Sequence, residues 1–150
     1  MILIPINKTI KENQEFVNNR DCEDIIYTTL DFYKKVEFNP PRISYLAVKG
    51  SQIVAVGGFK GKPVSGQIEI AYGTMERFRK KGNGTNVCKM LVELALKTDP
   101  SVIITARTLP ENNYSSRILE KNNFLLLVTI TDPDDGEVWE WKYNRPKNYL

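Results

Sequence analysis

The chain has 150 residues and a mass of 17.2 kDa, with 41% hydrophobic and 26% charged residues. This composition predicts one globular domain over residues 1–150, large enough to bury a core without disulfides or metal. Histidine is absent, which excludes Ser-His-Asp and Cys-His triads and histidine-based zinc sites, and we expect no metal cofactor. Any proton transfer must therefore use carboxylates, tyrosines, lysines or water.

The charge balance and the two cysteines bear on partners and compartment. The net charge of +3 is a mild excess that suits an anionic cofactor as well as nucleic acid. Cys22 and Cys88 lie in segments expected to be helical and lack C-x-x-C spacing, so we expect buried free thiols in a reducing compartment. Residues 1–7 are too short an apolar run for a signal peptide, and no uncharged run approaches the roughly 18 residues of a membrane span. These features predict a cytoplasmic protein with no membrane partner.

The first half of the chain is expected to contain helices and then a hairpin. Thr9–Glu12 has the spacing of a capping box, and Asp21 opens a second amphipathic stretch, so two closely joined helices are predicted. Asn39-Pro40-Pro41 then stops helical propagation. Residues 43–48 and 52–59 are β-rich and are predicted to form a hairpin through Gly50-Ser51.

The second half alternates strands and helices. A strand is expected over residues 67–75, and apolar residues recur at helical spacing over 85–97. The remaining elements are a strand over 102–106, a helix over 112–121, and a hairpin of strands over 124–130 and 138–143. This order predicts an α/β (α+β) fold with a mixed sheet.

A glycine-containing loop joins the strand to the amphipathic helix. It reads Arg79-Lys80-Lys81-Gly82-Asn83-Gly84-Thr85. Two glycines permit a tight turn with outward N–H groups, and the following helix amino-terminus favours an anion such as a pyrophosphate. An ordinary strand-to-helix turn with a solvated basic face fits the spacing equally well. A Walker loop is excluded because no lysine follows Gly84, and a dinucleotide fingerprint is excluded because Val87 replaces its third glycine.

The loop is part of a longer pattern. Residues Arg79 to Gly84 fit [QR]-x-x-G-x-[GA], and Asn112 to Phe124 fit N-x-x-[SA]-x-x-[VIL]-[LY]-E-K-x-[GN]-F. The run Glu69-Ile70-Ala71-Tyr72-Gly73 also fits a strand that precedes the first motif. Together, residues 43–143 resemble the GNAT superfamily of acyl-CoA-dependent N-acetyltransferases, closest to its ribosomal-protein and polyamine branch.

This resemblance implies a fold and a cofactor. The fold would have a mostly antiparallel central sheet, splayed between strands four and five and flanked by helices. The cofactor would be acetyl-CoA as acyl donor, bound through its pyrophosphate at the glycine loop and its pantetheine arm beside strand four. The resemblance implies these cofactor-binding residues: Gly73, Thr74, Met75, Arg79, Lys80, Lys81, Gly82, Asn83, Gly84, Thr85, Asn112 and Ser115. A helix cap is the alternative role for Asn112.

The resemblance also implies a reaction, in which a primary amine of a small molecule or peptide directly attacks the thioester in a ternary complex. Glu69 is our candidate base, with an ion pair to a neighbouring lysine as its alternative role. A strand-four amide near Gly73 or Thr74, exposed by a bulge, would stabilise the oxyanion. The usual acid position of the family is Leu119 here, so Tyr114 or Tyr72 would replace it, or the thiolate would take its proton from solvent or from the amine. A packing role is the alternative for each tyrosine.

The acceptor and the rival functions stay open at this point. Acidic residues that would attract a cationic amine if they face the cleft are Asp21, Glu23, Asp24, Asp31, Asp132, Asp134, Asp135 and Glu137. A non-catalytic acyl-CoA-binding sensor or interaction module is the main alternative, motivated by Leu119. Nucleic-acid binding through residues 77–81 and the basic tail of Lys142, Arg145 and Lys147 lacks a reader motif, so no nucleic acid is expected. A homodimer is compatible with the sequence.

Overall fold

The fold is built on a seven-stranded mixed sheet, in a computed structural model that describes residues 1–146. The strands are β1 (Ile2–Pro5), β2 (Ser44–Lys49), β3 (Gln52–Phe59), β4 (Gln67–Thr74), β5 (Ile103–Thr108), β6 (Phe124–Asp132) and β7 (Gly136–Tyr143). The helices are α1 (Gln14–Val17), α2 (Glu23–Lys35), α3 (Asn83–Thr98) and α4 (Tyr114–Lys121), with 3₁₀ turns η1 (Lys11–Asn13) and η2 (Glu76–Phe78).

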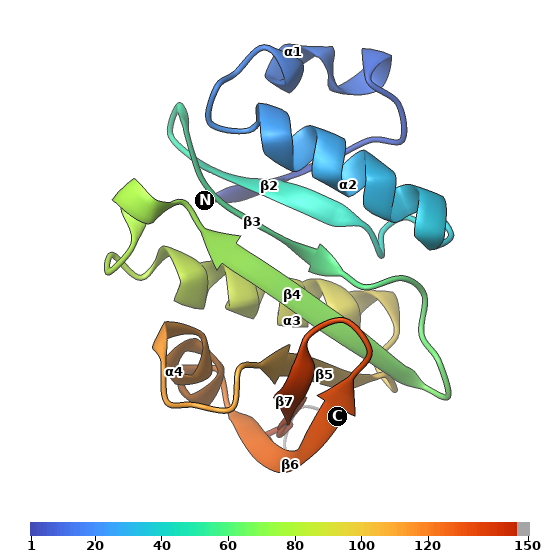
Figure 1. Ribbon diagram of the computed structural model, residues 1–150, viewed down its shortest axis with the longest axis vertical. Coiled ribbons are helices and arrows are strands. Elements are labelled where there is room, and N and C mark those ends of the chain that lie inside the picture. The colour runs from blue at the N-terminus through green and yellow to red at the C-terminus, as the bar shows by residue number, and fades with distance from the viewer. Residues whose placement is uncertain (147–150) are drawn as a thin grey trace.

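The sheet confirms the predicted fold class. Its strand order is β1-β2-β3-β4-β5-β7-β6, and every neighbouring pair is antiparallel except β4 and β5. Helix α2 crosses one face over β2 and β3, and α3 lies behind the sheet on the other face (Figure 1). We refer below to these two faces as the α2 face and the α3 face.

Strands β4 and β5 separate part of the way along. Their parallel pairing runs from Gln67 opposite Ile103 to Ile70 opposite Ala106. Beyond that point β4 continues to Thr74 paired only with β3, while β5 continues paired with β7. The predicted splay between strands four and five is therefore present, and it leaves one edge of β4 open.

Each face of the sheet has its own buried cluster. Leu91 of α3 shares the larger cluster with Ile70 and Ile104. Ile26 of α2 shares the smaller one with Leu46 of β2. Alternate strand residues thus supply opposite clusters, as a sheet covered by helices on both faces requires.

The amino-terminal region differs from its predicted form. Residues 2–5 form β1, which pairs antiparallel with β2, although only helices were expected in the first third. Thr9 and Glu12 do hydrogen-bond as in a capping box, but the turn they start is the 3₁₀ turn η1 followed by the four-residue α1. Pairing with the long strand β2 stabilises β1, and so short an edge strand has little periodicity of its own.

The two cysteines are buried free thiols, as predicted. Cys88 lies in α3, and Cys22 directly precedes α2 rather than lying inside a helix. Burial raises the pKa of Cys88 to about 12 and also raises the pKa of Cys22. None of the helices within residues 1–146 has the length and apolar character needed to cross a membrane.

Tyr33→Phe should lower the free energy of unfolding by about 1–2 kcal/mol. The Tyr33 hydroxyl donates to the Ile6 carbonyl at 2.8 Å and accepts from the Ser44 amide at 3.0 Å, so it joins α2 to β2 and to the segment after β1. Urea denaturation measures the loss, with Tyr27→Phe as the control because Tyr27 is 43% exposed. Equal losses in the two variants would contradict this role.

Candidate active site

The glycine loop forms a left-handed turn at the start of α3. Gly82 precedes the helix with φ of 80°, and a Cβ built on it would meet no atom within 4 Å. The turn is held from inside, because the buried Asn83 side chain donates to the Phe78 carbonyl at 3.0 Å. The first N–H groups of α3 have no partner inside the helix, so this turn presents donors and a positive dipole end to open space.

The second glycine of the loop is required for packing. A Cβ on Gly84 would lie 2.5 Å from Cδ1 of Ile118, 3.0 Å from Oγ1 of Thr74 and 3.4 Å from the Tyr114 hydroxyl. The start of α3 therefore approaches both α4 and the end of β4 closely. This contact places the phosphate-type turn beside the splayed edge of β4.

A cavity of about 270 Å³ lies between β4 and α4, and we call it the α4-side cavity. Its lining residues are Tyr72, Gly73, Thr74, Arg79, Asn113, Tyr114, Ser115 and Ile118. Five predicted site residues are therefore brought together here: Gly73, Thr74, Arg79, Tyr114 and Ser115. The Thr74 hydroxyl oxygen is buried and has no hydrogen-bond partner within residues 1–146, so the cavity offers an unused polar group to a ligand.

Backbone direction decides which β4 groups face the opening. The Met75 amide donates to the Val54 carbonyl of β3 at 3.0 Å. Because backbone groups alternate along an antiparallel strand, the amide of Gly73 also faces β3, and those of Tyr72 and Thr74 face the splay. The open edge thus carries a short row of strand-like donors and acceptors.

Three predicted positions differ from this arrangement. The β3–β4 register is regular through Gly73, so no bulge exposes its amide. Met75 cannot pair with a pantetheine arm, because its carbonyl accepts from the Phe78 amide and its own amide is bonded to β3. Asn112 is exposed and lies outside the cavity lining, and the cap of α4 is Asn113, which accepts from the Ser116 amide at 3.0 Å.

The remaining basic residues flank the loop or have structural partners. Lys80 and Lys81 are exposed beside the turn. Arg77 pairs with Asp21 at 2.6 Å and lies over the Phe78 ring. In the proposed basic tail, Arg145 donates to the carbonyls of Pro100 and Val102, and Lys147 lies outside the described residues. Arg77 and Arg145 thus have internal partners, whereas Lys80 and Lys81 are exposed beside the turn.

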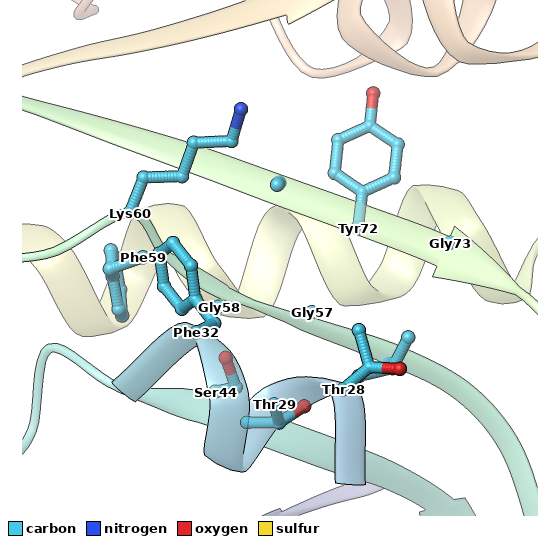
Figure 2. A pocket seen from close by; sticks show the side chains of 12 residues that line it. Thr28, Thr29, Phe32, Ser44, Gly57, Gly58, Phe59, Lys60, Tyr72 and Gly73 are labelled. Atoms are coloured by element: carbon cyan, nitrogen blue, oxygen red, sulfur yellow. The ribbon is translucent and has the colours of Figure 1, made fainter. Parts of the chain in front are cut away.

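A second cavity of about 390 Å³ lies on the α2 face, and we call it the α2-side cavity (Figure 2). Its lining residues are Thr28, Thr29, Phe32, Ser44, Val56, Gly57, Gly58, Phe59, Lys60, Ala71, Tyr72 and Gly73. Tyr72 and Gly73 line both cavities. A short stretch of β4 is therefore the shared wall between a cavity beside the phosphate-type turn and a cavity under α2.

The two candidate tyrosines have different surroundings. The Tyr72 hydroxyl donates to the Ser115 carbonyl at 3.0 Å, which joins β4 to α4 across the splay. Burial, with smaller contributions from Cys88 and Tyr114, raises the pKa of Tyr72 well above its ordinary value. Tyr72 is therefore a structural hydrogen-bond donor, and Tyr114 is the tyrosine whose hydroxyl lies by the start of α3.

Glu69 is flanked by two cations. Its carboxylate lies 3.0 Å from Lys60 Nζ and 3.7 Å from Arg107 Nε. Arg107 also pairs with Asp132 at 2.7 Å. These residues belong to a third cavity of about 360 Å³, the charged cavity, lined by Lys60, Lys62, Val64, Ser65, Gln67, Glu69, Thr105, Arg107 and Glu140. Lys60 lines both this cavity and the α2-side cavity, so the two are neighbours.

The sequence did not identify Lys60 or Arg107 as site residues. The ion pair of Glu69 with a lysine was an open alternative, but the particular lysine follows from the β3–β4 register, which brings Lys60 opposite Glu69. Arg107 reaches Glu69 because β5 pairs in parallel with β4. Neither pairing has a local sequence signal.

Several of the acidic residues expected near an acceptor have internal roles instead. Asp31 pairs with Lys34 on the exposed side of α2. Asp132 is buried at the β6–β7 turn, where its carboxylate accepts from the Asp134 amide and from Arg107.

Among residues 1–146, no group of three metal-ligating side chains is present.

A mixed sheet that splays beside a helix amino-terminus is the architecture of GNAT proteins, and comparison with known proteins agrees. The sequence profile of the family described as "Acetyltransferase (GNAT) domain" matches residues 5–125. The chain belongs to the GNAT acetyltransferase family, which confirms the resemblance found in its motifs.

Individual relatives match parts of the chain. N-acetyltransferase YjdG of Bacillus subtilis strain 168, described as uncharacterized, is 36% identical over 86 residues, which cover 55% of this chain and 51% of that protein. The aminoglycoside acetyltransferase AAC(6')-Ib, solved with ribostamycin and coenzyme A, has a TM-score of 0.60 at 25% identity, covering 69% of this chain and 64% of that chain. The match thus spans about half of YjdG and under two thirds of the aminoglycoside acetyltransferase.

A third comparison shows the fold alone. A chimera of the spermidine N-acetyltransferase SpeG from Vibrio cholerae and hSSAT has a TM-score of 0.68, with coverage of 95% of both chains and 9% identity. The whole described sheet and its helices therefore follow one shared architecture.

Asp132→Asn should reduce stability near neutral pH and have a diminishing effect in acid. Hydrogen bonds from the Asp134 amide, then from Arg107 and the Asp135 amide, lower the pKa of Asp132 from 3.8 to about 2. The ionised carboxylate thus stabilises the fold above the ordinary pKa, and this contribution is lost as the pH falls from about 4 towards 2. Thermal melting from pH 6 to pH 2 should show the difference from the parent shrinking by roughly half or more.

The exposed Asp134 of the same turn provides the control. Asp134→Asn should leave the melting temperature close to that of the parent throughout this range. A constant deficit for Asp132→Asn at all pH values would show that the ionised carboxylate is not the stabilising form.

Proposed function

We propose that the chain is an acetyl-CoA-dependent N-acetyltransferase that transfers an acetyl group to a primary amine. The observation that carries this proposal is the shared wall of β4, because Tyr72 and Gly73 line cavities on two sides of one strand. A donor in the α4-side cavity and an acceptor in the α2-side cavity can meet at this wall. Membership of the GNAT family and the CoA-bound aminoglycoside enzyme support the same activity.

The residues around the α4-side cavity suit acetyl-CoA. The outward amides at the start of α3, with Arg79, Lys80 and Lys81 nearby, suit a pyrophosphate. The open edge at Tyr72 and Thr74 suits the amide groups of a pantetheine arm. The buried Thr74 hydroxyl oxygen has no hydrogen-bond partner within residues 1–146, so it can bond to the ligand. When bound, acetyl-CoA supplies an acetyl group activated as a thioester.

Proton transfer falls to groups on either side of β4. Glu69 faces the α2 face, since its neighbours Ile68 and Ile70 lie in the α3-face cluster. We assign Glu69, which lines the neighbouring charged cavity, as the base that takes a proton from the incoming amine through water. We assign Tyr114 as the acid on the donor side, because the Tyr72 hydroxyl is committed to the Ser115 carbonyl. A β4 amide at the open edge would stabilise the negative charge that develops on the acetyl oxygen.

A second candidate is a CoA-binding module without catalysis. Leu119 occupies the position of the usual family acid and is fully buried. This alternative predicts affinity for acetyl-CoA without turnover, so binding and turnover must be measured separately.

Gly82→Glu should weaken acetyl-CoA binding by about 100-fold or more, because a carboxylate would project into the space that suits the pyrophosphate. Isothermal titration calorimetry with acetyl-CoA measures the effect. Gly136→Glu is a matched control, since Gly136 has φ of 73° and equally open space but lies in the β6–β7 turn. Both variants carry the same backbone strain, so equal affinities would overturn the assignment of the loop.

Glu69→Gln should lower kcat by about 100-fold while acetyl-CoA affinity is retained. Thiol release from acetyl-CoA is followed with polyamines, aminoglycosides, amino acids and peptide amino termini as acceptors. Glu37→Gln is the control, because it removes an exposed lysine ion pair, with Lys62, outside the proposed chemistry. Parental activity in Glu69→Gln would make Glu69 an ion-pair partner only. Binding without turnover of any amine would favour the non-catalytic module.

A further inference from the structure

The α2-side cavity carries a single charge. Among its twelve lining residues Lys60 alone is ionisable near neutral pH, and the others are apolar, hydroxyl-bearing or glycine. Its wall includes Phe32 and Val56, and its floor on β4 is made by Ala71 and Gly73. Figure 2 shows the Lys60 side chain extending alongside β4, the strand that carries Tyr72 and Gly73. The cavity is therefore mostly apolar, and its one charged lining residue, Lys60, lies at the end that adjoins Glu69.

No unpaired carboxylate is available there to bind a polycation. The twelve lining residues contain neither aspartate nor glutamate. The carboxylate on the adjoining β4 position, Glu69, already has Lys60 and Arg107 within 3.7 Å. Asp31 of α2 pairs with Lys34 on the exposed side of that helix. An acceptor with several ammonium groups would thus meet Lys60 without a free counter-charge.

Lys60 retains capacity for a further anion. The Lys60 side chain is 42% exposed, and its Nζ lies 3.0 Å from a carboxylate oxygen of Glu69, which leaves room on the ammonium group for a second anion. The adjacent charged cavity is lined by three cations and two carboxylates, and of these cations Lys62 pairs with Glu37 and Arg107 pairs with Asp132. Lys60, which also lines the α2-side cavity, is therefore the cation that a ligand there would contact. A ligand carboxylate at this junction would gain charge-assisted hydrogen bonds from a partly desolvated lysine.

We infer that the acceptor is an amino acid-type molecule, with a primary amine at the Tyr72–Gly73 wall, an apolar body along Phe32 and Val56, and a carboxylate at Lys60. This inference rests on the proposed function and specifies its substrate class. It distinguishes the chain from the neighbours named for aminoglycosides and spermidine, whose acceptors carry several positive charges. Lys60 is then a specificity-determining residue.

The test uses pairs of acceptors that differ only at the far end. A series of ω-amino acids from β-alanine to ε-aminocaproate is compared with diamines of matching length, using thiol release from acetyl-CoA. For the best length, kcat/KM should be about tenfold or more higher for the amino acid than for the diamine. Lys60→Gln should bring the two values close together, and Lys60→Glu should favour the diamine.

The ratio of the two kcat/KM values is the informative quantity, because Lys60 also contacts Glu69 and its loss can change both rates together. Lys97→Gln removes an exposed charge from the last turn of α3 and should leave the ratio unchanged. Calorimetry with CoA and each acceptor gives binding independently of turnover. Preference for diamines, a ratio insensitive to Lys60, or failure of every ω-amino acid to bind would overturn the inference. Failure of the unsubstituted chain to bind acetyl-CoA would instead overturn the proposed function.

Discussion

The separation of β4 from β5 after Ile70 and Ala106 is the constraint on which the rest of the site depends. Up to that pair, the facing backbone N–H and C=O groups of the two strands hydrogen-bond to each other. Beyond it β4 remains with β3, and β5 remains with β7, so the backbone groups of Tyr72 and Thr74 lose a strand partner. Unpaired backbone N–H and C=O groups at the edge of a sheet bind extended ligands, because the ligand makes the hydrogen bonds that a neighbouring strand would make. The splay therefore provides a binding edge in the middle of a sheet.

The splay is held open by contacts on both of its sides. The Tyr72 hydroxyl bonds to the Ser115 carbonyl, which fixes α4 at a set distance from β4. Gly84 permits the start of α3 to approach Ile118 and Thr74, where any side chain would collide. The loop amides and the open strand edge consequently lie close together. In the proposed function, one long phosphorylated ligand would contact both.

A second network supports the other side of β4. Asp132 closes the β6–β7 turn and pairs with Arg107, and Arg107 lies beside Glu69. Lys60, which directly follows β3, completes the set. The hairpin turn, three central strands and the α2-side cavity are thereby connected through charges. Asp132, a turn residue that lines none of the three cavities, is thus connected through Arg107 to the surroundings of the proposed base.

Much of the fold was predictable because its signals are local. The β2–β3 hairpin, α3, α4 and the final hairpin follow from turn residues and periodicity, and the loop at Gly82 follows from two glycines before an amphipathic helix. β1 was missed because its stability comes from pairing with β2. The expected pairing of Met75 with a pantetheine arm has a similar limit: only the observed register shows that the Met75 amide is already bonded to β3.

The donor-binding and acceptor-binding halves of the proposed site also differ in how far the sequence predicts them. The donor half consists mainly of backbone groups in a contiguous motif, so residue types such as glycine report its geometry directly. The proposed acceptor half is lined by residues of α2, β2, β3 and β4, and its one charged residue, Lys60, directly follows β3 and has no motif around it. Acidic residues could be counted in the sequence, but their internal pairing with Arg77, Lys34 and Arg107 could not. For this reason the sequence could identify a cofactor class, whereas the proposed acceptor class depends on how the fold pairs and places its charges.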